Sequence, residues 1–266
     1  MVRGASAEAL AELGDQLGTR TLADSATLGE ELLGVARVLR AEAALRRVAT
    51  DAAVEADAKA ALVGNVFGTA VGDKALGVVQ DAVRRRWTAS VDLAEVLERL
   101  GVRALVQSAG TDGTRVSDEL FAVRHLVDEN PELRIALSDP TRDLADRVGL
   151  LIGLLDGQTL PATTTLVAQA VSGTDSTVDA SLRTYQDIAA GARGETVATV
   201  RSARALSVAD QARLAEALGK QYDTTVHLHV VVDTDLVGGV RIEIGDDVID
   251  GSVANRLDDA RRRLAG

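Results

Sequence analysis

The chain has 266 residues, 46% of them apolar and 26% charged, with a formal net charge of −11. This length supports a buried core and two domains, whereas the negative charge and the five aromatic residues disfavour binding to a phosphate backbone or to stacked bases. Because cysteine is absent, disulfides, thiol catalysis and thiolate metal sites are excluded.

The amino terminus predicts no export signal, because Arg3 precedes any apolar segment. The longest uncharged stretch lies between Asp156 and Asp175, and it contains Pro161 and three threonines, so it does not suit a bilayer. We therefore expect contact with a membrane only through partners.

Residues 5 to about 190 show apolar positions at the three- and four-residue spacing of amphipathic helices. One stripe includes Leu28, Leu32, Val35 and Leu39, and it is expected to continue through Leu45 and Val48. Turn-forming residues interrupt the pattern near Asp51, 68–72, 110–113, 139–140, 156–157 and 173–175. The pattern is typical of an antiparallel helical bundle.

The helical part matches itself at a shift of 88 residues without a gap. Glu31 aligns with Glu119, Asp51 with Asp139, and residues 82–83 with residues 170–171. Two alanine- and leucine-rich segments can also match by composition alone. The constant register and the shared aspartate at a helix break favour a duplicated helical unit.

After Gly194 the spacing of the apolar residues changes, and strand-like alternation appears. Residues 195–202 are extended, Ser207 can cap a helix that carries Leu214 and Leu218, and residues 226–233 alternate as a half-buried strand. Residues 240–244 form a further strand that can return through 248–249 as a hairpin. A last helix is expected to carry Val253, Leu257, Ala260 and Leu264 on one face.

The predicted fold is mainly α: an amino-terminal helical bundle, duplicated or extended, followed by a small α+β domain. We place a first helical unit at residues 1–110, a second at 111–193, and the α+β domain at 194–266.

The chain lacks the phosphate-loop, zinc-protease, serine-hydrolase and dinucleotide motifs. His227 and His229 are too few for a metal site and are expected to be exposed strand residues. The arginine runs 84–86 and 261–263 fit solvated helix faces, and Trp87 fits the core. We predict no catalytic residue, no metal and no cofactor.

Residues 226–251 are the informative segment. An alternating strand ends at Asp233, then come Leu236-Val-Gly-Gly239, a second strand that ends at Gly245, and finally Asp250-Gly-Ser252. Paired glycines between strands allow a positive φ or a close backbone approach. This motif resembles that of the delta subunit of the bacterial F-type ATP synthase, whose mitochondrial counterpart is the oligomycin-sensitivity-conferring protein.

The helical part resembles the same family at two places. Residues 130–140 resemble the stretch before the family's third helix, and residues 7–10 resemble the start of its first helix, with Ser6 in place of the usual tyrosine. Ordinary members are shorter by about one helical unit. The chain is therefore similar to the long form found in high-GC Gram-positive bacteria.

The resemblance implies a non-catalytic stator on the cytoplasmic face of the cell membrane. Its helical bundle would receive an amino-terminal helix of the alpha subunit in the headpiece, and its carboxyl-terminal domain would hold the stalk helices of subunit b. Which helical copy binds the headpiece stays open.

For the stalk contact we expect Leu236, Val237, Gly238, Gly239, Val253 and Leu257. The residues expected to shape turns and caps are Asp233, Gly245, Asp250, Gly251 and Ser252. The alternative is that all of them determine the local fold while the partner binds elsewhere.

Two other functions fit the same residues less well. One is a stand-alone helical adaptor with an appended α+β domain. The other is an enzyme that uses the aspartates at 233, 235, 246, 247 and 250 with a divalent metal.

Overall fold

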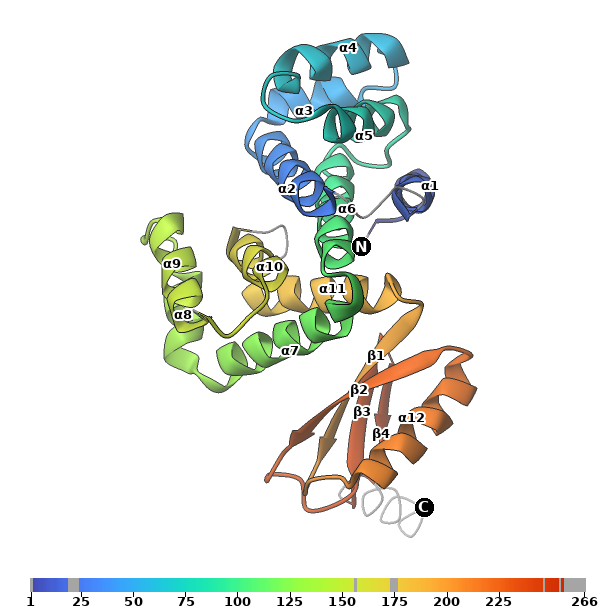
Figure 1. Ribbon diagram of the computed structural model, residues 1–266, viewed down its shortest axis with the longest axis vertical. Helices are drawn as coiled ribbons and strands as arrows, with labels where there is room; N and C mark the ends of the chain where they lie inside the picture. Colours follow the sequence, from blue (N-terminus) through green and yellow to red (C-terminus); the bar gives the residue numbers. More distant parts are fainter. Residues whose placement is uncertain are drawn as a thin grey trace, which may run out of the picture. The chain divides into compact units, whose positions relative to one another are not determined.

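The computed structural model describes residues 2–18, 24–155, 157–172, 177–245, 247–253 and 255. The chain forms two compact units, Met1–Ala189 and Ala190–Gly266, which are treated separately below. The first unit is helical and the second contains a sheet (Figure 1). Within the described part of the chain, no helix combines the length and the apolar character needed to cross a membrane.

The helical unit confirms the expectation of a mainly α protein. Its first helices are α1 (Ala5–Gly18), α2 (Ser25–Ala41), α3 (Ala43–Thr50), α4 (Ala56–Phe67), α5 (Asp73–Arg84) and α6 (Asp92–Ser108). The later helices are α7 (Gly113–Glu129), α8 (Pro131–Ser138), α9 (Leu144–Leu155), α10 (Pro161–Ser172) and α11 (Val178–Gly191), with a short 3-10 turn at Gly110–Asp112.

The duplication is confirmed by the helix boundaries. Helices α7, α8, α9 and α10 begin and end 88 residues after α2, α3, α4 and α5, respectively. The contacts repeat as well, because α4 packs on α5 as α9 packs on α10. The same sequence pattern has therefore produced the same local packing twice.

Two side chains make the repeat visible in hydrogen bonds. The Oε1 atom of Glu31 accepts from the amide of Gly72 at 3.0 Å, and the Oε2 atom of Glu119 accepts from the amide of Leu160 at 2.9 Å. Each carboxylate satisfies a free donor at the start of a helix, α5 in one repeat and α10 in the other.

Asp51 and Asp139, the aspartates that align at the shift of 88, shape equivalent turns. Asp51 Oδ1 accepts from the amide of Ala53 at 2.8 Å, and Asp139 Oδ1 accepts from the amide of Thr141 at 2.9 Å. The shared aspartate is thus the turn residue that ends α3 and α8.

Helix α6 belongs to both repeats. At the shift of 88 residues, α1 of the first repeat aligns with α6, and α6 aligns with α11. Accordingly, α1 contacts α5 and α6 contacts α10. The two repeats are therefore fused through one helix.

The first repeat crosses α2 over α6 at two glycines. A Cβ atom on Gly29 would lie 2.8 Å from the carbonyl oxygen of Gly101, and one on Gly101 would lie 3.0 Å from that of Gly29. Only glycine allows the two backbones to come so close.

The predicted apolar stripe is correct over α2, where Leu28, Leu32 and Leu39 are buried, but it is wrong for Val48. Glu42 has non-helical backbone angles and separates α2 from α3, so α3 starts with a new phase. Val48 is consequently exposed, and Ala49 occupies the core. Trp87 is half-buried against the core, and its indole N–H donates to the carbonyl of Ala82.

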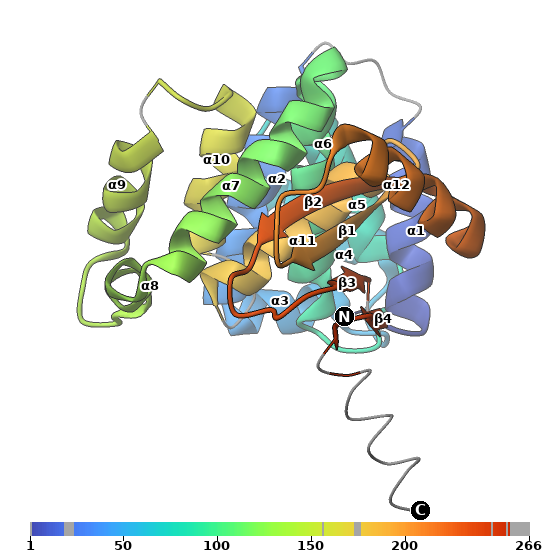
Figure 2. The same cartoon turned by 90° about the horizontal axis from the view of Figure 1, so that it is seen from below.

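In its described residues, the second unit is a four-stranded sheet with one helix on a face (Figures 1 and 2). Its elements are β1 (Glu195–Ser202), α12 (Val208–Tyr222), β2 (Thr225–Val232), β3 (Val240–Ile244) and β4 (Asp247–Asp250). The spatial order is β2-β1-β3-β4, with β1 and β2 parallel and the other neighbours antiparallel.

The start of α12 confirms the predicted cap, because Ser207 Oγ accepts from the amide of Asp210. The hairpin through residues 248–249 is confirmed by the pairing of β3 with β4. Leu218, Val226 and Ile242 pack together between α12 and the sheet.

The expectation of exposed histidines is wrong for His229, which is 5% exposed, while His227 is half-buried. Both faces of β2 carry buried residues, since Val226 lies on one face and His229 on the other. The edge of the His227 ring meets the His229 ring at a centroid distance of 4.9 Å.

Candidate functional site

The loop between β2 and β3 begins with a turn shaped by Asp233. The amide of Asp233 donates to the carbonyl of Ser202, and its Oδ1 atom accepts from the amide of Asp235 at 3.0 Å. Leu236 then donates its amide to the carbonyl of Asp233. These hydrogen bonds shape the turn at Asp233.

Gly239 is required by the backbone. Its φ is +83°, and a Cβ atom there would lie 2.4 Å from the carbonyl oxygen of Gly251 and 2.9 Å from the Cα atom of Ser252. A Cβ atom on Gly238 would lie 3.1 Å from Cγ2 of Val253. The two glycines thus let the loop 236–239 pack directly on residues 251–253.

Asp250 and Ser252 hold the other side of this contact. The amide of Ser252 donates to Asp250 Oδ1 at 2.9 Å, and Ser252 Oγ accepts from the amide of Asn255 at 3.3 Å. Gly251 and Val253 donate their amides to the carbonyls of Val240 and Gly238. The hydrogen bonds from the Ser252 side chain and amide lower the pKa of Asp250.

The residues expected at the stalk contact differ in exposure. Val237 is 84% exposed and Val253 is 39% exposed, whereas Leu236 is half-buried. Leu257 lies outside the described residues, as do Ala260 and Leu264. Val237 and Val253 are therefore the members of the set that can offer apolar surface to a partner.

Three carboxylates of this region are engaged in local structure. Asp233 and Asp250 shape turns, and Asp247 Oδ2 accepts from the hydroxyl of Tyr222 at 3.1 Å. Gly245 has a φ of +56° at the turn between β3 and β4. Asp246 lies outside the described residues.

The helical unit contains a groove of about 620 Å³ between α2, α9 and α10. It is lined by Glu30, Leu33, Arg37, Leu144, Ala145, Val148, Thr165, Ala168, Gln169 and Ser172. Glu30 and Arg37 supply opposite charges, and most of the other lining side chains are small or aliphatic. Such a lining suits the apolar face of a helix with polar residues along its edges.

The equivalent seam of the first repeat carries larger polar side chains that bond across it. Arg84 on α5 forms an ion pair with Asp57 on α4 at 3.3 Å, and Gln80 donates to the carbonyl of Ala60 at 3.4 Å. In the second repeat the positions of Asp57, Ala60, Gln80 and Arg84 are taken by Ala145, Val148, Ala168 and Ser172. These four residues form no ion pair across the α9–α10 seam, where the groove lies.

Helix α9 carries an unusual amount of exposed apolar surface beside the groove. Leu144, Leu150 and Leu154 are 41%, 39% and 48% exposed, while Leu151 and Leu155 are buried. Exposed leucines this close together on one helix mark a surface for interaction.

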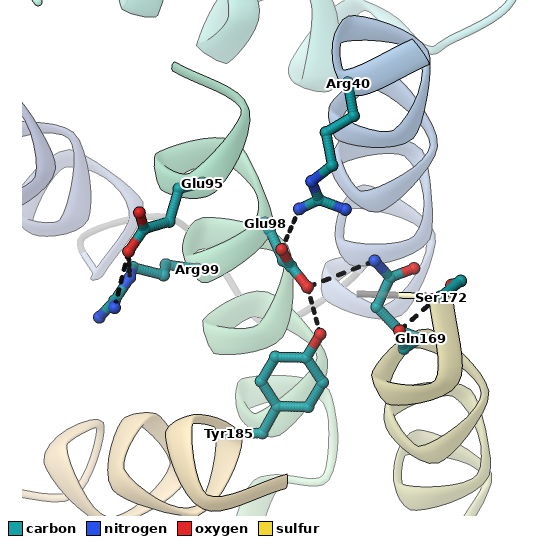
Figure 3. A network of polar contacts seen from close by, with 7 residues as sticks. All are labelled: Arg40, Glu95, Glu98, Arg99, Gln169, Ser172 and Tyr185. Carbon is teal, nitrogen blue, oxygen red and sulfur yellow. Dashed lines mark hydrogen bonds and ion pairs between the residues drawn. The ribbon is translucent and has the colours of Figure 1, made fainter. Parts of the chain in front are cut away.

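A buried polar network joins the repeats around Glu98 of α6, which is 3% exposed (Figure 3). Its carboxylate pairs with Arg40 of α2 and accepts from the hydroxyl of Tyr185 of α11, and Gln169 Nε2 of α10 donates to it at 3.4 Å. On another side of α6, Arg99 pairs with Glu95 at 2.9 Å.

The network and the groove were not predicted from the sequence. A glutamate between Leu97 and Leu100 in the apolar stripe of α6 is a signal that could have indicated a buried ion pair. Its partners come from three other helices, and sequence spacing does not identify them.

A protein-family model described as "ATP synthase delta (OSCP) subunit" matches residues 102–264. The match begins within α6 and so covers the second repeat and the sheet unit. The chain is 51% identical to an ATP synthase subunit delta of Nocardioides sp., over 100% of this chain and 98% of that protein.

Two further relatives are similar over nearly their full lengths. An ATP synthase subunit delta of Streptomyces avermitilis is 41% identical over 98% of this chain and 98% of that protein. One of Corynebacterium aurimucosum is 37% identical over 99% of this chain and 100% of that protein.

Proposed function

The chain belongs to the family of ATP synthase delta (OSCP) subunits, and on this premise we propose that it is a non-catalytic stator subunit of the F-type, proton-translocating ATP synthase. It links the alpha/beta headpiece to the stalk helices of subunit b, on the cytoplasmic face of the cell membrane. It reaches the membrane only through these partners.

The observation that carries this proposal is the open groove between α2, α9 and α10. We assign it to an amphipathic amino-terminal helix of the alpha subunit. Seven of the ten residues that line the groove belong to α9 and α10, within the part of the chain that the family model matches. The corresponding α4–α5 seam of the first repeat is bridged by the Arg84–Asp57 ion pair.

A stator must hold the headpiece while the central stalk turns, so its contacts need slow dissociation. Burying a large aliphatic side chain contributes about 1.5–3 kcal/mol, and a few such anchors in one groove meet this need. Leu33 and Val148 line the groove, and Leu144 also lines it while remaining 41% exposed.

For the stalk contact we propose the exposed part of the carboxyl-terminal motif. Val237 and Val253 offer apolar surface, and Leu257 extends this set along the chain. Leu236, Gly238 and Gly239 support the contact by fixing the loop that carries Val237.

To test the assignment, the ion pair that bridges the α4–α5 seam of the first repeat is introduced across the groove. The double variant Ala145→Asp/Ser172→Arg places the Asp57–Arg84 pair at the equivalent positions. We expect washed membranes of this variant to lose headpiece ATPase activity and ATP-driven proton pumping. The matched control, Asp57→Ala/Arg84→Ser, opens the first-repeat seam and should leave both intact. Coupled pumping in the closed variant would contradict the assignment.

A further inference from the structure

The first repeat contains a pocket of about 420 Å³ that the stator function does not use. Its lining residues come mainly from the end of α3, the start of α4, and the end of α5 with the residues that follow it. It is lined by Lys59, Arg84, Arg85, Arg86 and Trp87, together with Glu55, Thr50, Val54 and four alanines. Four cations in one pocket are unexpected in a chain with a net charge of −11.

Lys59 is 5% exposed, and its ammonium group makes no hydrogen bond or ion pair with any of the described residues. The equivalent residue of the second repeat, Arg147, donates from Nη1 to the carbonyl of Leu137 at 3.2 Å. The stem of Lys59 is buried while its ammonium lines the pocket without a carboxylate partner among the described residues, so a negatively charged ligand in the pocket would complement it.

Arg86 is a second cation without an ion pair among the described residues. Its neighbours differ, because Arg84 pairs with Asp57 and Asp81 at 3.3 Å each and Arg85 pairs with Glu12. Lys59 and Arg86 are therefore two cations of the pocket that form no ion pair with a described carboxylate, although Glu55 also lines the pocket.

The start of α4 adds backbone donors to the same pocket. Glu55 is the N-cap residue and makes no side-chain cap hydrogen bond. Within the described chain the amides of Ala56, Asp57 and Ala58 have no acceptor, and Ala56 lines the pocket. Free amides and the helix dipole favour an anion at this position.

We propose that this pocket binds a small molecule that carries a phosphate group. Two unpaired cations and several amide donors match a dianion with three acceptor oxygens better than a carboxylate, which has one charge and two oxygens. The ring of Trp87 and the alanine wall are suited to the part of the molecule that is not phosphate. The inference is independent of the stator function.

The chain has one tryptophan, so Trp87 fluorescence reports on this pocket alone. The purified full chain is titrated with inorganic phosphate, with AMP, and with sodium acetate at matched ionic strength. We expect saturable changes for phosphate and AMP, with Kd values in the millimolar range or tighter, and no saturation with acetate.

Three variants assign the site. Lys59→Met keeps the aliphatic stem, and Arg86→Gln changes an exposed side chain. Each variant should weaken binding by about tenfold or more. Lys74→Gln, on α5 outside the pocket, is the control and should bind as the wild type does. Equal saturation by acetate and phosphate, no saturable change, or unchanged affinity in both pocket variants would overturn the proposal.

Discussion

The hydroxyl of Tyr185 donates a hydrogen bond to the carboxylate of Glu98, which lies 87 residues earlier in the chain. Tyr185 belongs to the last helix of the second repeat, and Glu98 belongs to the helix that the two repeats share. Arg40 reaches the same carboxylate from the first repeat. One buried carboxylate thus ties both repeats to α6 (Figure 3).

This arrangement predicts that Tyr185→Phe destabilises the chain. The variant removes one donor from a buried carboxylate while keeping the ring, so we expect a loss of about 1–3 kcal/mol in the free energy of unfolding measured with urea. Glu98→Ala should cost about 3–5 kcal/mol, because it leaves Arg40 without its carboxylate partner. If the Tyr185→Phe variant is as stable as the wild type, the hydrogen bond from Tyr185 to Glu98 does not stabilise the chain.

Replacing the capping residues Glu31 and Glu119 is expected to destabilise the chain by different amounts. Glu119 accepts from the amide of Leu160 and from the hydroxyl of Thr163 at 2.6 Å, whereas Glu31 accepts from the amide of Gly72. We expect Glu119→Ala to cost about 1–2 kcal/mol and Glu31→Ala to cost less. The measurement is thermal unfolding of each variant, and equal losses would contradict the difference.

A side chain added at Gly239 is expected to strain the backbone of the sheet unit locally. Gly239→Ala places a Cβ atom 2.4 Å from the carbonyl oxygen of Gly251 at a positive φ, so we expect a loss of about 2 kcal/mol or more in the sheet unit. The control is Gly245→Asn, which also has a positive φ but meets no atom within 4 Å. Asparagine tolerates this conformation, so the control should lose well under 1 kcal/mol. Hydrogen exchange of β3 amides measures both.

The lowered pKa of Asp250 predicts that the turn at this residue is sensitive to acid. Its pKa lies below the usual 3.8 because the side chain and amide of Ser252 donate to it. A lowered folded-state pKa contributes stability that is present above the unfolded value and is lost as the pH falls through the folded value. We expect the sheet unit to lose stability as the pH falls below about 4, and Asp250→Asn to reduce this dependence. An Asp250 carboxyl resonance that titrates at or above 3.8 would contradict it.

The sequence predicted the features that depend on neighbours a few residues away. The helix breaks at Asp51 and Asp139 follow from turns in which the aspartate accepts from the amide two residues later. The strands at 226–232 and 240–244 follow from alternation, and the Ser207 cap follows from a hydroxyl that reaches an amide three residues on. The prediction for Val48 was wrong because one non-helical residue, Glu42, separates α2 from α3 and changes the helical phase.

The sequence by itself determined the period of each element, the 88-residue repeat and the glycines of the carboxyl-terminal motif, because these depend on local backbone preferences. Only the tertiary structure decided the sheet order β2-β1-β3-β4, the sharing of α6, the partners of Glu98 and the opening of the groove at α9. These features join residues far apart in the chain, and they are fixed by the sum of many packing contacts that no short segment encodes.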